Sequence, residues 1–202
     1  MIGIILAGGQ SRRMGGGDKG TRRVGGRSIL DRVAAAMRPQ CEHLVISANG
    51  DPERFASLGL PVAEDSVPDY PGPLAGVLAG LDHVAHHHPG AAFAVTVPTD
   101  TPFLPHDLIA RLEDGRVADR AAIVCAHSGD AKHHVAALWS VALRAALRRA
   151  LVEEGSRKVG AFITRHPVAY VTWPVEPYDP FLNVNTPEDL AVAERIAASL
   201  QA

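Results

Sequence analysis

The sequence has few aromatic residues, only two cysteines and no long apolar run. Aromatic residues make up 5% of the 202 residues, so we expect a core of Ala, Val, Leu and Ile. Cys41 and Cys125 have no CxxC partner and no histidine at zinc-finger spacing, which predicts reduced, partly buried thiols. No run reaches the roughly 18 apolar residues of a transmembrane helix, and the N-terminus lacks the basic start of a signal peptide. Length and composition together predict one cytoplasmic domain over residues 1–202.

The sequence also lacks a large net charge. Its formal charge is -2, which argues against a protein that binds nucleic acid or a membrane surface. The charge is unevenly distributed, however. Residues 1–40 hold eight basic and two acidic residues, a net of +6, whereas the remainder holds 12 basic and 20 acidic residues, a net of -8. The cationic first segment of an otherwise nearly neutral protein therefore needs an explanation.

Short apolar runs alternate with amphipathic stretches along most of the chain. The runs are the expected strands, and they cover residues 2–6, 44–47, 93–97, 122–125, 134–138 and 168–172. They are continuously apolar, which is typical of strands covered on both faces in a mostly parallel sheet. Helices are expected after the cap Ser28, over 74–84 and 141–152, and after the cap Thr186, where Pro187 takes the first helical position. This alternation predicts an α/β fold, a three-layer sandwich.

A glycine-rich loop with several cations follows the first expected strand. It has the sequence LAGGQSRRMGGGDKG over residues 6–20 and includes Arg12, Arg13 and Lys19. Loops at the carboxyl ends of parallel strands are the usual ligand-binding positions of open α/β sheets. Glycines let backbone N–H groups approach phosphate oxygens, and neighbouring cations repel one another unless an anion lies between them. The loop is therefore a candidate phosphate site.

Two common nucleotide-binding motifs do not account for this loop. A P-loop requires GK followed by Ser or Thr, whereas Asp18 precedes Lys19 and Gly20 follows it. Gly15, Gly17 and Gly20 match GxGxxG, but the match begins nine residues after the strand and no helix is expected to follow it. The second expected strand also does not end in a convincing acidic residue for a ribose. An NAD-dependent dehydrogenase is therefore disfavoured.

Four sequence blocks, taken in order, resemble a known enzyme family. They are DKG at 18–20, GPLAG at 72–76, VPTDTPFL at 97–104 and NVNTPEDL at 183–190. With the LAGG start of the loop, they make almost the whole chain similar to the molybdenum cofactor guanylyltransferase family of nucleotidyltransferases. The resemblance implies a Rossmann-like, mostly parallel sheet of the nucleotide-diphosphate-sugar transferase type. One stretch departs from the family pattern, because His133 and His134 stand where members often have Gln-Pro.

The resemblance implies transfer of GMP from GTP to molybdopterin, the organic part of the molybdenum cofactor, with release of pyrophosphate. The attacking group in such a reaction is a phosphate oxygen, which is anionic near neutral pH, so no general base is required. Positioning and charge neutralisation should supply the catalysis. The further partners implied are proteins that deliver molybdopterin and molybdoenzymes that accept the product. We expect a monomer that binds neither nucleic acid nor a membrane.

The same resemblance assigns residues to the nucleotide. Lys19 is implied to contact the nucleotide and Arg13 to lie near the triphosphate, and with Asp100 they are the candidate catalytic residues. The implied nucleotide-binding residues are Leu6, Ala7, Gly8, Lys19, Asn49, Asp65 and Asp100. A carboxylate or an amide can pair with the N1–H and 2-amino edge of guanine, but the sequence leaves open which of Asn49, Asp65 and Gly76 does so. Asn49 is also the first residue of an Asn-Gly-Asp turn.

Asp100 is the strongest candidate for a Mg²⁺ ligand. It follows the expected strand 93–97 in a turn flanked by prolines, where a ligand would bind. Mg²⁺ prefers one or two protein oxygens together with phosphates and water, and the resemblance assigns Asp100 to this ion. Similarity to the wider nucleotidyltransferase group makes Asn185 the candidate second ligand, ahead of Asn183. Asparagine just before a helix cap is also ordinary capping chemistry.

Other functions remain open at this point. A related nucleotidyltransferase would use CTP, or would act on a sugar or polyol phosphate. A non-catalytic nucleotide-binding protein would keep the fold, but it would have less need of Lys19 and Asp100 together. The choice of nucleotide in a pyrophosphate-release assay distinguishes these alternatives.

Overall fold

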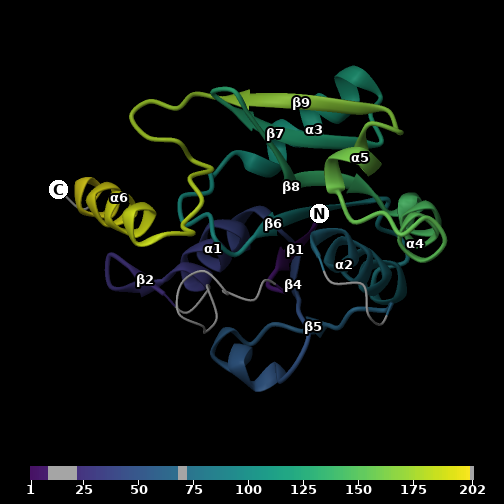
Figure 1. Ribbon diagram of the computed structural model, residues 1–202, viewed down its shortest axis with the longest axis horizontal. Coiled ribbons are helices and arrows are strands. Elements are labelled where there is room, and N and C mark those ends of the chain that lie inside the picture. The colour runs from purple at the N-terminus through teal and green to yellow at the C-terminus, as the bar shows by residue number, and fades with distance from the viewer. Residues whose placement is uncertain (9–21, 68–71, 201–202) are drawn as a thin grey trace.

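The computed structural model describes residues 1–8, 22–67 and 72–200, and its central feature is a seven-stranded sheet (Figure 1). In spatial order the strands are β5 (Val62–Ala63), β4 (His43–Ser47), β1 (Ile2–Leu6), β6 (Phe93–Pro98), β8 (Ala131–Ser140), β7 (Ile123–Ser128) and β9 (Val168–Trp173). β8 is antiparallel to both of its neighbours, and the other pairings are parallel. The predicted mostly parallel α/β sheet is confirmed.

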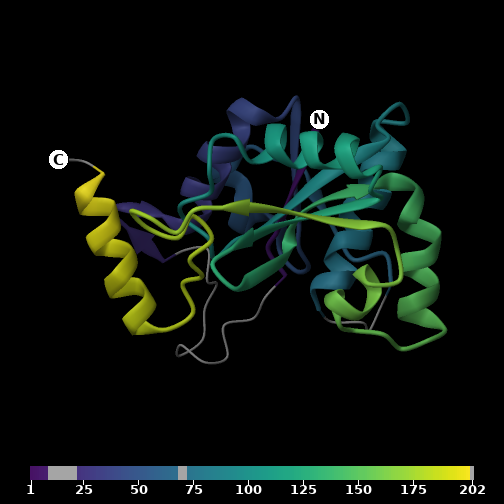
Figure 2. The same ribbon diagram turned by 90° about the horizontal axis from the view of Figure 1, so that it is seen from above.

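Helices cover both faces of this sheet (Figure 2). On one face lie α1 (Ile29–Met37), α3 (Leu108–Asp119) and α6 (Pro187–Ser199). The other face is covered by α2 (Pro73–His87), α4 (Arg144–Val152) and α5 (Val159–Ile163). α6 also contacts a short hairpin formed by β2 (Arg23–Val24) and β3 (Arg27–Ser28). The predicted three-layer arrangement is thus confirmed.

The two apolar layers explain why the strands show no alternating pattern. In β1, the adjacent side chains of Ile4 and Ile5 are both fully buried, and they belong to the clusters on opposite faces of the sheet. A central strand covered on both sides must therefore be apolar at every position. Both cysteines are free thiols, with Cys125 buried and Cys41 partly exposed. Within the described ranges, no helix is long and apolar enough to cross a membrane.

The predicted helix caps are present. The Ser28 hydroxyl accepts a hydrogen bond from the Asp31 backbone N–H at 3.0 Å, and Thr186 and Asp189 form a reciprocal capping box. The segment predicted as one helix over 141–152 begins with a 3-10 turn, η4 (Val141–Leu143), before α4. Elements absent from the sequence prediction are α3, α5, β5, the β2–β3 hairpin and the 3-10 helices η2 (Arg38–Gln40) and η3 (Pro52–Leu58).

Candidate nucleotide and metal site

The carboxyl ends of four neighbouring parallel strands bring the predicted site residues together. Strands β5, β4, β1 and β6 are in register at this edge, where Leu6 pairs with both Ser47 and Pro98. Four of the predicted residues lie two positions beyond the end of their strand, and they are Asp65, Asn49, Gly8 and Asp100. Residues separated by up to 92 positions in the chain therefore share one edge of the sheet. This is the position at which open α/β sheets bind ligands.

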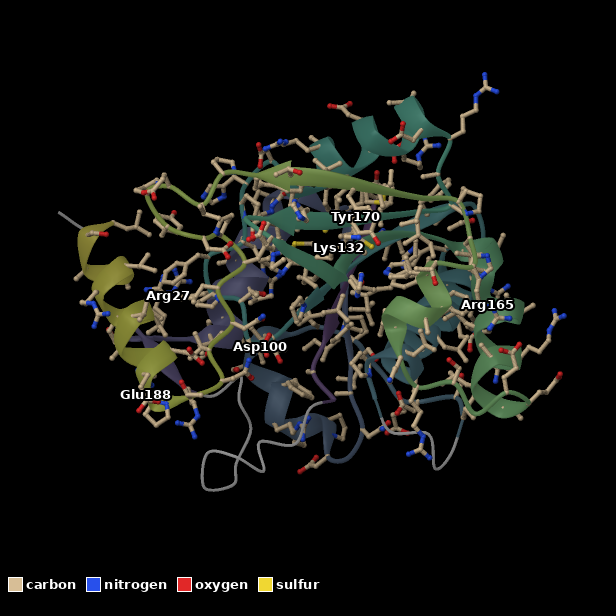
Figure 3. All side chains as sticks on the ribbon, turned by 45° about the horizontal axis from the view of Figure 1, so that its top comes forward. Arg27, Asp100, Lys132, Arg165, Tyr170 and Glu188 are labelled. Carbon is tan, nitrogen blue, oxygen red and sulfur yellow. The ribbon has the colours of Figure 1, made fainter. Side chains whose placement is uncertain are left out.

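Asp100 provides a buried carboxylate oxygen at this edge. Its Oδ1 atom is buried, and its backbone carbonyl accepts a hydrogen bond from the Val184 N–H at 2.8 Å. That bond holds the segment leading into α6 against the turn after β6, as Figure 3 shows around the labelled Asp100. Asn185 follows Val184 directly, so a carboxylate and an amide oxygen come from two adjoining segments. Hard oxygen donors of this kind fit Mg²⁺, which takes few protein ligands when phosphates are also bound.

The backbone around Asn185 is fixed by the cap of α6. The N–H groups of Asn185 and Thr186 both donate to Asp189 Oδ2, at 2.9 and 2.8 Å. Desolvation raises the pKa of the Asp189 carboxyl, but the hydrogen bonds from Asn185 and Thr186 together outweigh it, so the pKa is lowered. The capping chemistry that the sequence raised as an alternative role for this asparagine is therefore present, but it engages the backbone N–H. Asn183 lies on the other side of Val184 and lines a cavity next to β8.

Asn49 and Asp65 form a reciprocal pair that joins the ends of β4 and β5. Asn49 Nδ2 donates to Asp65 Oδ2 at 2.6 Å, and the Asp65 backbone N–H donates to Asn49 Oδ1 at 2.9 Å. Two of the residues that the sequence analysis left as alternatives for the base are therefore in direct contact. Gly76, the third candidate in the sequence analysis, lies close by, since its carbonyl accepts a hydrogen bond from the Ser47 hydroxyl at 2.9 Å.

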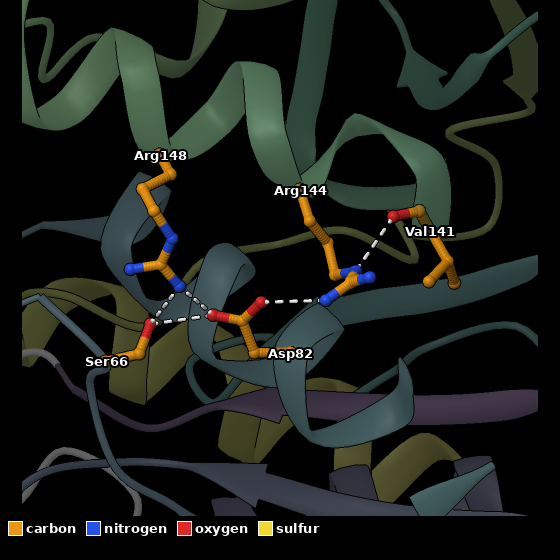
Figure 4. Close-up of polar contacts among 5 residues, drawn as sticks. All are labelled: Ser66, Asp82, Val141, Arg144 and Arg148. Carbon is orange, nitrogen blue, oxygen red and sulfur yellow. Dashed lines mark hydrogen bonds and ion pairs between the residues drawn. The ribbon is translucent and has the colours of Figure 1, made fainter. Parts of the chain in front are cut away.

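A charged network on the outer face holds the segment that carries Asp65 (Figure 4). Ser66 donates to Asp82 Oδ2 at 2.8 Å, and Arg148 Nη2 contacts the same oxygen at 2.6 Å and the Ser66 hydroxyl at 3.2 Å. Arg144 Nη1 contacts the other oxygen of Asp82 at 3.3 Å. The network ties the chain after β5 to α2 and α4, and so fixes the residue next to Asp65.

One cation at the end of β1 was missed by the sequence analysis. Arg54, in η3, donates from Nη2 to the Ala7 carbonyl at 3.3 Å, and its guanidinium lies 4.5 Å from the centroid of the Phe55 ring. The Ala7 N–H donates in turn to the Ser47 carbonyl at 2.8 Å, beside the half-buried Leu6 and the exposed Gly8. No local pattern marks Arg54, since its position depends on how η3 folds back on the sheet.

Two predicted residues, Arg13 and Lys19, lie outside the described residues, as does the GxGxxG match at 15–20. Their roles stay predictions. The described part of the edge therefore contains the oxygen donors Asp100 and Asn185 and the Asn49–Asp65 pair.

The sheet is mostly parallel, and carboxylate and amide groups lie at its adjoining strand ends. In the sequence, a glycine-rich cationic segment follows β1. This combination is typical of a nucleotide-binding transferase. The model of the MobA-like NTP transferase domain matches residues 3–169. The molybdenum cofactor guanylyltransferases of Nitrobacter hamburgensis and Bradyrhizobium sp. are 52% and 56% identical to this chain, each over 97% of it and over 94% and 92% of their own lengths. The chain belongs to the molybdenum cofactor guanylyltransferase family.

A solved structure supports the fold independently. Molybdopterin-guanine dinucleotide biosynthesis protein A from Archaeoglobus fulgidus has a TM-score of 0.77 and 24% identity to this chain, covering 98% of this chain and 100% of its own. The sheet order and layers described above are therefore those of a known architecture.

Proposed function

We propose that this protein transfers GMP from GTP to molybdopterin, releasing pyrophosphate and forming the guanine dinucleotide cofactor. The observation that carries this proposal is the convergence of Gly8, Asn49, Asp65 and Asp100 at one sheet edge. These are the positions that the family resemblance assigns to GTP. Identity above 50% to curated guanylyltransferases over nearly the full chain supports the same pair of substrates.

The proposed reaction is one phosphoryl substitution. A phosphate oxygen of molybdopterin forms a bond to the α-phosphorus of GTP, the bond from that phosphorus to the bridging oxygen breaks, and pyrophosphate leaves with the bonding electrons. The second pKa of a phosphate monoester is about 6, so the attacking oxygen needs no side chain to remove a proton. The protein's contribution is to hold two anionic substrates in contact and to reduce their repulsion.

Each group at the edge has a role in this scheme. The Asn49–Asp65 pair would bind the base or the ribose, and the backbone around Gly8 would approach the phosphates. Lys19 and Arg13 would neutralise the triphosphate, as the resemblance implies. Asp100, with Asn185 as the second donor, would hold Mg²⁺, which when bound neutralises charge on the phosphate oxygens. The proposal also includes a monomer in the cytoplasm.

Pyrophosphate release tests this function. The purified protein with Mg²⁺ is incubated with each of the four NTPs, with and without molybdopterin. Release is expected only when GTP and molybdopterin are both present. A preference for CTP would remove the guanine assignment, and release with a sugar or polyol phosphate in place of molybdopterin would remove the acceptor assignment. Nucleotide binding without release under every condition would indicate a non-catalytic binding protein.

A further inference from the structure

The sheet order divides the carboxyl edge into two halves. The Asn49–Asp65 pair lies at the ends of β4 and β5, whereas Asp100 follows β6, on the other side of β1. Neighbouring strands lie about 4.8 Å apart, so about 10 Å separates the ends of β4 and β6. In the proposed site, the phosphates of the nucleotide therefore lie at the Asp100 half and the base at the half formed by β4 and β5.

Arg54 lies at the half proposed for the base. It belongs to η3, which follows β4, and its Nη2 atom donates to the Ala7 carbonyl at 3.3 Å. The Ala7 N–H donates in turn to the carbonyl of Ser47, the last residue of β4. The guanidinium is therefore close to the ends of β1 and β4, which lead directly to Gly8 and Asn49.

The guanidinium of Arg54 is oriented by its own helix. Its central carbon lies 4.5 Å from the centroid of the Phe55 ring, and Phe55 is buried in the apolar layer that contains α1. The start of η3 is capped, because Asp51 Oδ1 accepts a hydrogen bond from the Glu53 N–H at 2.9 Å. An aromatic face holds a guanidinium without neutralising its charge. Arg54 is also exposed, so a ligand at this edge can reach it.

Guanine requires hydrogen-bond donors as well as acceptors from the protein. Its N1–H and 2-amino groups donate, whereas its O6 and N7 atoms accept. The Asn49–Asp65 pair offers a carboxylate, which only accepts, and an amide that already donates to that carboxylate at 2.6 Å. Arginine commonly pairs with O6 and N7 of guanine, because two N–H groups of its planar fork match the two acceptors. Arg54 supplies such a fork at the half proposed for the base.

We propose that Arg54 is a specificity-determining residue that donates hydrogen bonds to the O6 and N7 atoms of guanine. This inference rests on the proposed function, since it adds a residue to the same nucleotide site. A guanidinium has five N–H groups, so it can bond to the Ala7 carbonyl and to a base at the same time. The acceptor groups of guanine then meet Arg54, and its donor groups meet the carboxylate and amide at the ends of β4 and β5.

The same contact accounts for a preference for GTP over the other nucleotides. Adenine has an amino group in place of O6, and cytosine has an amino group at the equivalent edge, so both turn a donor toward a side chain that only donates. Uracil has an acceptor oxygen there but no N7, and so it can make only part of the contact. Arg54 therefore bears on the choice between GTP and CTP that the sequence left open.

Calorimetric binding of nucleotide analogues, with Mg²⁺ and without molybdopterin, tests the proposal. 7-Deaza-GTP has a C–H group in place of N7, and the wild type should bind it about tenfold more weakly than GTP, as expected for one lost hydrogen bond to a charged group. Arg54→Ala should bind GTP at least about tenfold more weakly than the wild type and should bind GTP and 7-deaza-GTP within about twofold of each other. Inosine triphosphate lacks only the 2-amino group, so its loss relative to GTP should be the same in both proteins.

Arg38→Ala is the matched control. Arg38 is also exposed, and its Nη2 atom donates to the Leu58 carbonyl at the other end of η3 at 2.6 Å. The control therefore removes an arginine that contacts η3 far from the strand ends, and it should keep the wild-type preference for GTP over 7-deaza-GTP. Thermal melting checks the fold. If Arg54→Ala melts early, Arg54→Met replaces it, because methionine keeps an unbranched stem over Phe55.

Two results would overturn the assignment. The first is a wild type that binds GTP and 7-deaza-GTP equally, and the second is a folded Arg54→Ala protein that keeps the wild-type preference. The assignment and the proposed function fail separately, because binding is measured without the acceptor. Pyrophosphate release from a protein in which Arg54→Ala changes no preference supports the function and refutes the role of Arg54. A preference that is lost in Arg54→Ala, in a protein that releases no pyrophosphate under any condition, supports the role of Arg54 and refutes the transfer reaction.

Discussion

The two edges of the sheet each contain a cavity of similar size, but the groups at the strand ends differ between the edges. The cavity at the amino edge, lined by Cys41, His43, His83 and His88 among others, is the larger, at about 370 Å³ against about 290 Å³ at the carboxyl edge. The carboxyl edge nevertheless has the Asn49–Asp65 pair and a buried oxygen of Asp100. Volume alone therefore does not identify the site. The direction of the strands does, because parallel strands deliver their following loops to one edge only.

The amino edge is built from packing and local charge contacts. The His43 and His88 rings stack at 4.4 Å, and the Met1 ammonium contacts Glu42 at 2.8 Å and lowers the pKa of that carboxyl. Burial raises the pKa of the Cys41 thiol to about 11, so it stays protonated and is a poor nucleophile. In the ranges that the structure describes, no group of three or more His, Cys, Asp or Glu side chains is placed to bind a metal ion.

The largest effect is expected at Asp100. Asp100→Asn keeps the size and shape of the side chain but removes the charge available to Mg²⁺, while the backbone bond to Val184 stays. We expect turnover to fall by at least about a hundredfold, as for other electrostatic groups at phosphate-transfer centres. The thermal midpoint should not decrease. Pyrophosphate release and thermal melting measure the two quantities.

Asp119→Asn is the matched control for this variant. Asp119 is exposed at the end of α3, four residues before β7 begins at the amino edge of the sheet, so the same chemical change should leave turnover unchanged. Full activity of Asp100→Asn at every Mg²⁺ concentration would disprove the metal role and remove the main chemical distinction between the two edges.

A smaller effect is expected from the network behind Asp65. Arg148→Ala removes the contacts to Asp82 and Ser66, so the segment after β5 is held less firmly. We expect about a threefold rise in the KM for GTP with kcat nearly unchanged, because exposed ion pairs contribute at most about 1 kcal/mol. Arg165→Ala is the control, since it removes a similarly exposed ion pair to Glu154 away from the strand ends. Equal effects of the two variants would show that Arg148 does not position Asp65.

The sequence was sufficient to predict those strands and helix caps that depend on neighbouring residues. All six predicted strands and the caps at Ser28 and Thr186 are present, because continuous apolarity and capping chemistry are properties of neighbouring residues. Helix α3 was missed, since its buried residues lie only near its start and Gly115 interrupts it. The glycine is needed for packing, as an added Cβ would lie 2.7 Å from Val171 Cγ2 on β9. That contact joins distant segments and leaves no local pattern.

The arrangement of the candidate site was predictable only in part. Asp100 was proposed from the strand that it follows together with the family resemblance, whereas Asn49 was implied by the resemblance, and their roles stay predictions. The pairing of Asn49 with Asp65 was not predicted, since β5 has two residues and gives no periodic signal. Arg54 was missed for a related reason, because its contact with Ala7 joins residues 47 positions apart. Tertiary contacts therefore determine how the predicted residues are combined.

The smallest effect is expected at the amino edge. Burial and neighbouring histidines lower the pKa of His83 and His88, while Glu42 opposes this at His88. The unfolded chain binds these protons more readily than the folded chain. The stability contributed by the neutral rings is therefore complete above the ordinary histidine pKa of about 6.5, and it is lost as the pH falls through the lowered folded-state pKa.

The double variant His83→Gln/His88→Gln should therefore show a smaller drop in thermal midpoint than the wild type between about pH 8 and about pH 5, with turnover within about twofold at neutral pH. Burial also lowers the pKa of His133 and His134, so they add to the pH dependence of stability. Both residues are present in the wild type and in the double variant, so the difference between the two proteins reports on the amino edge. Parallel melting curves would show that these rings do not titrate on unfolding. A large loss of turnover would place a functional group at the amino edge and end the distinction drawn from strand direction.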